Sequence, residues 1–152
     1  MPAHDQLFQE WHSHIYGPVG IFLIDMRGNR VTGDGVQHST NPILGEDQWN
    51  AIKEFFQREQ LKVIILAAEI PFVGHDPERI KVEAEKHHFL TGYWPYHLQD
   101  LERLLNLCFG WKNQDKDGRE VLLLGGEIHC GVTSVIRCSS SCILNWLMGM
   151  IR

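Results

Sequence analysis

The stretch at residues 120–136, EVLLLGGEIHCGVTSVI, constrains the fold more than any other part of this 152-residue chain. Its first half holds a short unbroken apolar run at residues 121–124, which is followed directly by two glycines. An apolar run of this length that ends at glycine is typical of a strand buried on both faces of a sheet. The alternating pattern at residues 132–136 then predicts a second strand. We therefore expect the fold to be built around a central sheet.

Two further apolar runs and three helical patterns extend this prediction. Residues 19–26 and 61–68 are predicted to form strands buried on both faces, because both segments are short, almost wholly apolar and flanked by glycine or proline. Strands that alternate with helices favour an α/β fold in which helices flank the strands of a sheet. The amphipathic patterns predict helices at residues 46–59, 77–88 and 98–109.

An acidic residue and a histidine follow the central predicted strand. Glu127 and His129 are two positions apart, so in extended backbone their side chains project to the same side. Open α/β sheets carry their chemistry at the carboxyl ends of their strands, and oxygen with imidazole ligands suits a catalytic metal ion. His75, in the loop after the predicted strand at 61–68, is a third candidate ligand.

The composition excludes two classes of partner. The chain has 14 basic and 19 acidic residues, a formal charge of −5 and no basic run, which disfavours nucleic acids and anionic membrane surfaces. The longest apolar tract, at residues 143–151, is too short to cross a bilayer. The N-terminus lacks the pattern of a signal peptide, so a cytoplasmic location is the default expectation.

The cysteines are expected to be ordinary thiols of a reducing compartment, because all of them lie in the last third of the chain. A cysteine phosphatase loop would need five residues between Cys130 and Arg137, and six intervene. A zinc site that includes His129 matches no familiar ligand spacing. The four cysteines are Cys108, Cys130, Cys138 and Cys142.

The N-terminal part is predicted to be a helical segment at residues 1–16, with a short amphipathic helix at residues 7–16. Neighbouring histidines on a helix project in different directions and do not easily share one ion. We therefore expect the pairs His12/His14 and His87/His88 to be solvated. In the aromatic turn at residues 92–97, Trp94 and His97 are expected to plug the core rather than line a pocket.

Several blocks, taken in their order along the chain, resemble the PhoD-like phosphatases, a family of metallophosphatases. The resemblance covers a partial metallophosphatase domain at residues 17–137, whereas residues 138–152 form a divergent tail. The blocks are GPVGIFLIDMRGNR at residues 17–30, LGEDQW at 44–49, GYWPYH at 92–97, LLNLCFGWK at 104–112 and REVLLLGGEIHCG at 119–131.

The resemblance implies a metallophosphatase sandwich of two β-sheets flanked by helices, which hydrolyses phosphate mono- or diesters at a metal centre. Iron and calcium are the implied ions. Glu127 and His129 would be late metal ligands, with glutamate in place of the family's usual aspartate. The family's earlier metal and nucleophile motifs would precede residue 17, so the chain resembles the C-terminal half of the catalytic domain.

Two functions follow from this pattern. The chain is either a fragment of a metal-dependent phosphoesterase that acts on a phosphate ester, or a catalytically inactive truncated relative that serves as an interaction module. In both cases one face of a sheet would lack the layer that covers it in a complete sandwich. We therefore expect exposed apolar surface and possible self-association.

Overall fold

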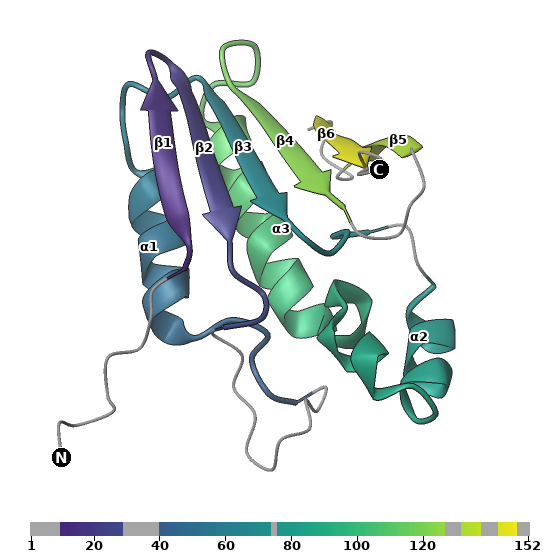
Figure 1. The fold of residues 1–152 in the computed structure, drawn as a ribbon. Helices are drawn as coiled ribbons and strands as arrows, with labels where there is room; N and C mark the ends of the chain where they lie inside the picture. Colours follow the sequence, from purple (N-terminus) through teal and green to yellow (C-terminus); the bar gives the residue numbers. More distant parts are fainter. Residues whose placement is uncertain (1–9, 29–39, 74–75, 127–131, 138–142, 149–152) are drawn as a thin grey trace, which may run out of the picture.

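In a computed structural model, residues 10–28, 40–73, 76–126, 132–137 and 143–148 are described, and they form a mixed α/β fold. The strands of this part build a six-stranded sheet in the order β1-β2-β3-β4-β6-β5 (Figure 1). The predicted α/β class, with helices flanking the strands, is confirmed. The strands are β1 (His12–Tyr16), β2 (Val19–Ile24), β3 (Val63–Ala68), β4 (Glu120–Gly125), β5 (Val132–Arg137) and β6 (Ile143–Met148).

The centre of the sheet is parallel. Strands β2, β3 and β4 are in register, so Ile21, Ile65 and Leu122 are direct neighbours on one face. Strand β1 returns antiparallel along β2 through a two-residue loop, and Gly17 in that loop has φ of 59°. Glycine adopts this left-handed conformation without the penalty that a Cβ brings. The connections from β2 to β3 and from β3 to β4 are long crossovers that carry helices.

Helices α1 (Glu46–Phe56) and α3 (Leu98–Asn113) lie against the same face of the sheet (Figure 1). Trp49, Ile52 and Phe55 of α1 are buried, as their helical spacing predicted. Between β3 and α3 the chain forms α2 (Pro77–Ala84) and two short 3₁₀ helices, η1 (His88–Gly92) and η2 (Trp94–Tyr96). Helix α2 is shorter than the predicted helix at 77–88, because the chain leaves the α conformation before η1 begins.

The two faces of the sheet differ in how well they are covered. Phe22, Ile64 and Leu123 point to the face under α1 and α3, and each is almost completely buried. The alternate residues of the same strands, such as Ile21, Ile65 and Leu122, remain partly exposed. In the described part of the chain, α1 and α3 therefore cover one apolar face, and the opposite face, which we call the open face, is also apolar.

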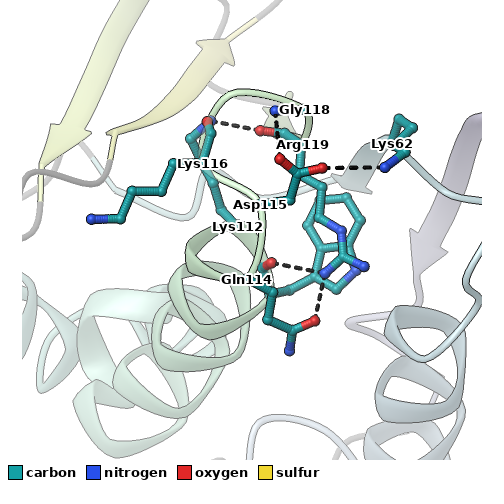
Figure 2. Close-up of polar contacts among 8 residues, drawn as sticks. Lys62, Lys112, Gln114, Asp115, Lys116, Gly118 and Arg119 are labelled. Carbon is teal, nitrogen blue, oxygen red and sulfur yellow. Dashed lines mark hydrogen bonds and ion pairs between the residues drawn. The ribbon is translucent and has the colours of Figure 1, made fainter.

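A polar network fixes the turn that leads from α3 into β4 (Figure 2). The buried ammonium of Lys112 donates to the carbonyl oxygens of Arg119 and Lys116 at 2.6 and 3.2 Å, and to Glu120 Oε1 at 2.8 Å. Asp115 accepts from Lys62 Nζ at 3.2 Å, which joins the turn to the start of β3. These contacts satisfy the buried charge of Lys112 and hold the start of β4 beside β3.

Two predictions about the ends of the chain need correction or extension. The predicted helix at residues 7–16 is wrong for residues 12–16, which form strand β1. The tail after residue 137 contributes strand β6, which inserts between β4 and β5. Strand β5 confirms the strand that the alternating pattern at residues 132–136 predicted.

None of the helices in the described ranges combines the length and hydropathy required to cross a membrane.

Candidate functional site

The parallel strands β2, β3 and β4 end together at one edge of the sheet, which we call the carboxyl edge. Their last residues, Ile24, Ala68 and Gly125, are direct neighbours in the register. The residues that follow β2 and β3 are Asp25 and Glu69, so two acidic residues belong to this edge. Open α/β sheets bind ligands at such an edge, which makes it the candidate functional site.

The three predicted metal ligands come after strands β3 and β4 in the sequence. Glu127 and His129 follow β4 by two and four residues, and His75 lies in the loop after β3. All three fall outside the described residues, so their role as ligands stays a prediction. Elsewhere, within the described ranges, no group of three or more His, Cys, Asp or Glu side chains could hold a metal ion. The described residues of the carboxyl edge therefore do not fit a metal ion by themselves.

Asp25 is held in one conformation at the end of β2. Its Oδ1 accepts the backbone N–H groups of Arg27 at 2.9 Å and Gly28 at 2.7 Å, which closes a tight turn. Its backbone N–H donates to Gln48 Oε1 at 2.8 Å, and its carbonyl accepts from Gln48 Nε2 at 2.9 Å. Gln48 is completely buried, so this pair of hydrogen bonds ties α1 rigidly to the end of β2.

An ion pair joins the segments after β2 and β3. Arg27 Nε lies 3.4 Å from Glu69 Oε1, and the two side chains are 66% and 33% exposed. Such a solvated pair contributes at most about 1 kcal/mol to stability. A largely exposed guanidinium remains available to oxygen anions, since it has further N–H donors beyond the one that faces Glu69. The carboxyl edge thus offers a cation of the kind that recognises phosphate groups.

Gly125 lets the loop after β3 pass directly over the end of β4. A Cβ atom placed on Gly125 would lie 2.6 Å from Cα of Pro71, closer than real atoms approach. Glycine in a strand permits such a close approach, and the neighbour here is the backbone at Pro71. The path of the loop that leads toward His75 is therefore fixed where it crosses β4.

The aromatic turn beside this loop is part of the core, as predicted. Trp94 is completely buried and stacks on Phe72, with ring centroids 5.3 Å apart and an interplanar angle of 28°. His97 is also buried, and its two ring nitrogens lie 3.0 Å from the carbonyl oxygen of Asn41 and 2.7 Å from that of Thr91. The contact with Asn41 holds the start of α3 against the segment before α1, and the contact with Thr91 holds it against η1.

Cys108 behaves as the predicted ordinary thiol. Its side chain is completely buried in α3 and forms no disulfide, and burial strongly raises the pKa of the thiol. A thiol held in its neutral form is neither a nucleophile nor a metal ligand. The other three cysteines lie outside the described residues.

Comparison with solved structures gives a match to PhoD. The TM-score is 0.67 and the identity is 17%, and the match covers 93% of this chain and 28% of the PhoD chain. The chain has part of the PhoD fold. It spans less than a third of the length of the PhoD chain, so the likeness to PhoD concerns one portion of that protein. Neither the family models nor the curated proteins give a match.

The sequence did not predict the contacts of three residues at the carboxyl edge. Gln48 was missed because it lies on the buried side of a helix that was read only for its apolar spacing. Arg27 and Glu69 follow different strands, and their pairing depends on the register of β2 with β3. A sequence signal did exist, since both charged residues occur within three positions of a strand end.

Proposed function

We propose that this chain is part of a PhoD-like, metal-dependent phosphoesterase that acts on phosphate mono- or diesters. The observation that supports the proposal most strongly is the fold likeness to PhoD, which extends over 93% of the chain. The resemblance that the sequence suggests, in the ordered blocks at residues 17–30, 44–49, 92–97, 104–112 and 119–131, points to the same family.

The proposal assigns roles to residues at and beyond the carboxyl edge. Glu127 and His129, with His75 as a third candidate, would ligate a metal ion, and iron and calcium are the ions that the resemblance implies. A bound metal ion would polarise the phosphate ester and acidify a bound water. Arg27 would bind the phosphoryl oxygens of the substrate through its guanidinium. Gln48 would keep the end of β2 in place through its two hydrogen bonds to Asp25.

Phosphate binding tests the role of Arg27. Inorganic phosphate should shift the backbone amide resonances of Arg27 and Gly28 in a titration followed by NMR. Arg27→Met should weaken this binding by about tenfold, since it removes a charge-assisted hydrogen bond. Glu69→Gln should strengthen binding, because the carboxylate that competes for the guanidinium is lost.

The matched control is Arg79→Met, which removes an exposed arginine from α2. It should leave phosphate affinity unchanged. Equal weakening by the two arginine variants would indicate a general charge effect, and the assignment of Arg27 would then be wrong.

The chain by itself should have negligible phosphodiesterase activity even with added iron and calcium. The reason is that a dinuclear metal centre needs more ligands than the three candidates at residues 75, 127 and 129. An aryl phosphodiester with a coloured leaving group measures the activity directly. Turnover that disappears on His129→Ala would mean that the metal site is more complete than we propose.

A second candidate function is that of an interaction module, and the open face of the sheet favours it. Ile21, Ile65 and Leu122 form an apolar row across three neighbouring strands of that face and are partly exposed. An apolar face of this kind is typical of a surface that another layer covers. We propose that, in the isolated chain, a second copy covers it through self-association.

A further inference from the structure

Strand β1 places two histidines side by side on the open face of the sheet. All five residues of β1 are exposed, and the strand lies at the edge of the sheet, paired with β2. His12 is directly opposite Leu23 and His14 is opposite Ile21. Residues paired across strands share a face, so both imidazoles project from the face that α1 and α3 leave uncovered. The helix expected from the sequence would have turned them in different directions.

The spacing of the two rings suits a shared metal ion. The ring centroids of His12 and His14 are 5.3 Å apart, and the rings are nearly perpendicular at 86°. With a metal–nitrogen distance of about 2.1 Å, two imidazoles at a tetrahedral angle have centroids roughly 5.2 Å apart. Tyr16 stacks on the other side of His14, with centroids 6.4 Å apart at 22°, which limits the motion of that ring.

The hydrogen bond of His12 leaves its other ring nitrogen available as a ligand. Nδ1 of His12 lies 2.8 Å from the carbonyl oxygen of Glu10. A carbonyl oxygen only accepts hydrogen bonds, so Nδ1 carries the proton and Nε2 keeps its lone pair. Metal-binding histidines commonly donate their second ring nitrogen to a backbone carbonyl in this way, which fixes the tautomer and the ring orientation.

We propose that His12 and His14 form a surface site for a divalent transition-metal ion. Two neutral imidazoles suit Cu²⁺, Ni²⁺ and Zn²⁺, and the affinity should be greatest for Cu²⁺. Among the described residues, no third His, Cys, Asp or Glu side chain joins the pair. Ca²⁺ and Mg²⁺ prefer sites built from oxygen ligands and should not bind here.

Ni²⁺ is a suitable probe, because it favours imidazole and its paramagnetism broadens nearby NMR signals. Substoichiometric Ni²⁺ added to the full chain should broaden the resonances of His12, His14 and their partners Ile21 and Leu23 first. Ca²⁺ should leave these resonances unchanged. Calorimetric titration gives the dissociation constant for the same ion.

A sequence swap provides a matched test of the geometry. The double variant Ser13→His with His14→Ser keeps the composition but places the two imidazoles on opposite faces of β1. Loss of a residue that only supports a metal ligand typically lowers metal affinity by about 10- to 100-fold. The swap displaces a ligand itself, so it should weaken Ni²⁺ binding by at least this factor. His12→Ala should have a similar effect, whereas His87→Ala, at an exposed histidine after α2, should have none.

The amide spectrum of each variant reports whether strand β1 is intact, since these exposed positions carry no core packing. His14→Gln, which keeps a polar side chain of similar reach, serves as a second variant if the swap disturbs the strand. The proposal would be overturned if the swap or His14→Gln, in an intact fold, bound Ni²⁺ as tightly as the parent chain. Broadening centred away from β1 would overturn it equally.

Discussion

Replacing Phe55 by alanine should lower the free energy of unfolding by about 3 to 5 kcal/mol, as truncation of a core aromatic residue does. Phe55 is 2% exposed on the inner side of α1, and its ring meets that of Phe22 edge to face at a centroid distance of 5.4 Å. Beneath it, a Cβ on Gly20 would lie 2.6 Å from Cζ of Phe55. The ring therefore fills the space directly above β2, and its loss would leave a cavity between helix and sheet.

Chemical denaturation of the parent chain and of the Phe55→Ala variant, monitored by circular dichroism, measures this difference in the free energy of unfolding. Asn50→Ala is the matched control, because Asn50 is exposed on the same helix and its truncation should change stability by no more than about 0.5 kcal/mol. An unchanged midpoint for Phe55→Ala would contradict the packing of α1 on the sheet.

The strands and helices of the central fold could be predicted because their side chains are buried. Strands β2, β3 and β4 contain apolar runs, and the inner sides of α1 and α3 repeat apolar residues at helical spacing. Burial is the physical cause of both patterns. The start of α2 was also predictable, because Asp76 accepts the N–H of Glu78 at 3.0 Å and Pro77 follows it.

The two ends of the chain lacked such a signal. Strand β1 has no buried side chain, so its sequence, HSHIY, carries no pattern that burial would impose. Its pairing with β2 depends on the turn at Gly17 rather than on hydrophobic spacing. Strand β6 was missed for another reason: a short, largely apolar segment can be a strand or part of a helix, and the place of β6 between β4 and β5 depends on contacts distant in sequence.

The position of the carboxyl edge could be predicted from the sequence, but the contacts between its residues could be predicted only in part. Its position follows from where the buried strands end, which the sequence marks with Asp25, Glu69 and Gly125. The bond between Gln48 and the backbone of Asp25, and the pairing of Arg27 with Glu69, depend on how separate elements are placed. No spacing rule within one element encodes such contacts, because the partners are more than 20 residues apart in the chain.

The chain should self-associate through the open face of its sheet. On this face, Ile21 of β2, Ile65 of β3 and Leu122 of β4 lie in one row and are partly exposed. Complete burial of an exposed side chain of this size contributes about 1.5 to 3 kcal/mol, and covering side chains that are already partly buried gains a fraction of this value for each residue of the row. Light scattering should therefore show a mass that rises with concentration, and a hydrophobic dye should bind.

Ile65→Thr tests this surface, because threonine keeps the β-branched shape of a strand residue but replaces apolar atoms by a hydroxyl. It should lower both the association and the dye signal. Val82→Thr, at a valine that is 55% exposed on α2 and outside the sheet, makes the same kind of change and should alter neither. A parent chain that remains monomeric on concentration, binds no dye and melts cooperatively would show that the open face needs no partner. Hydration of that face would then not be unfavourable enough for association to lower the free energy.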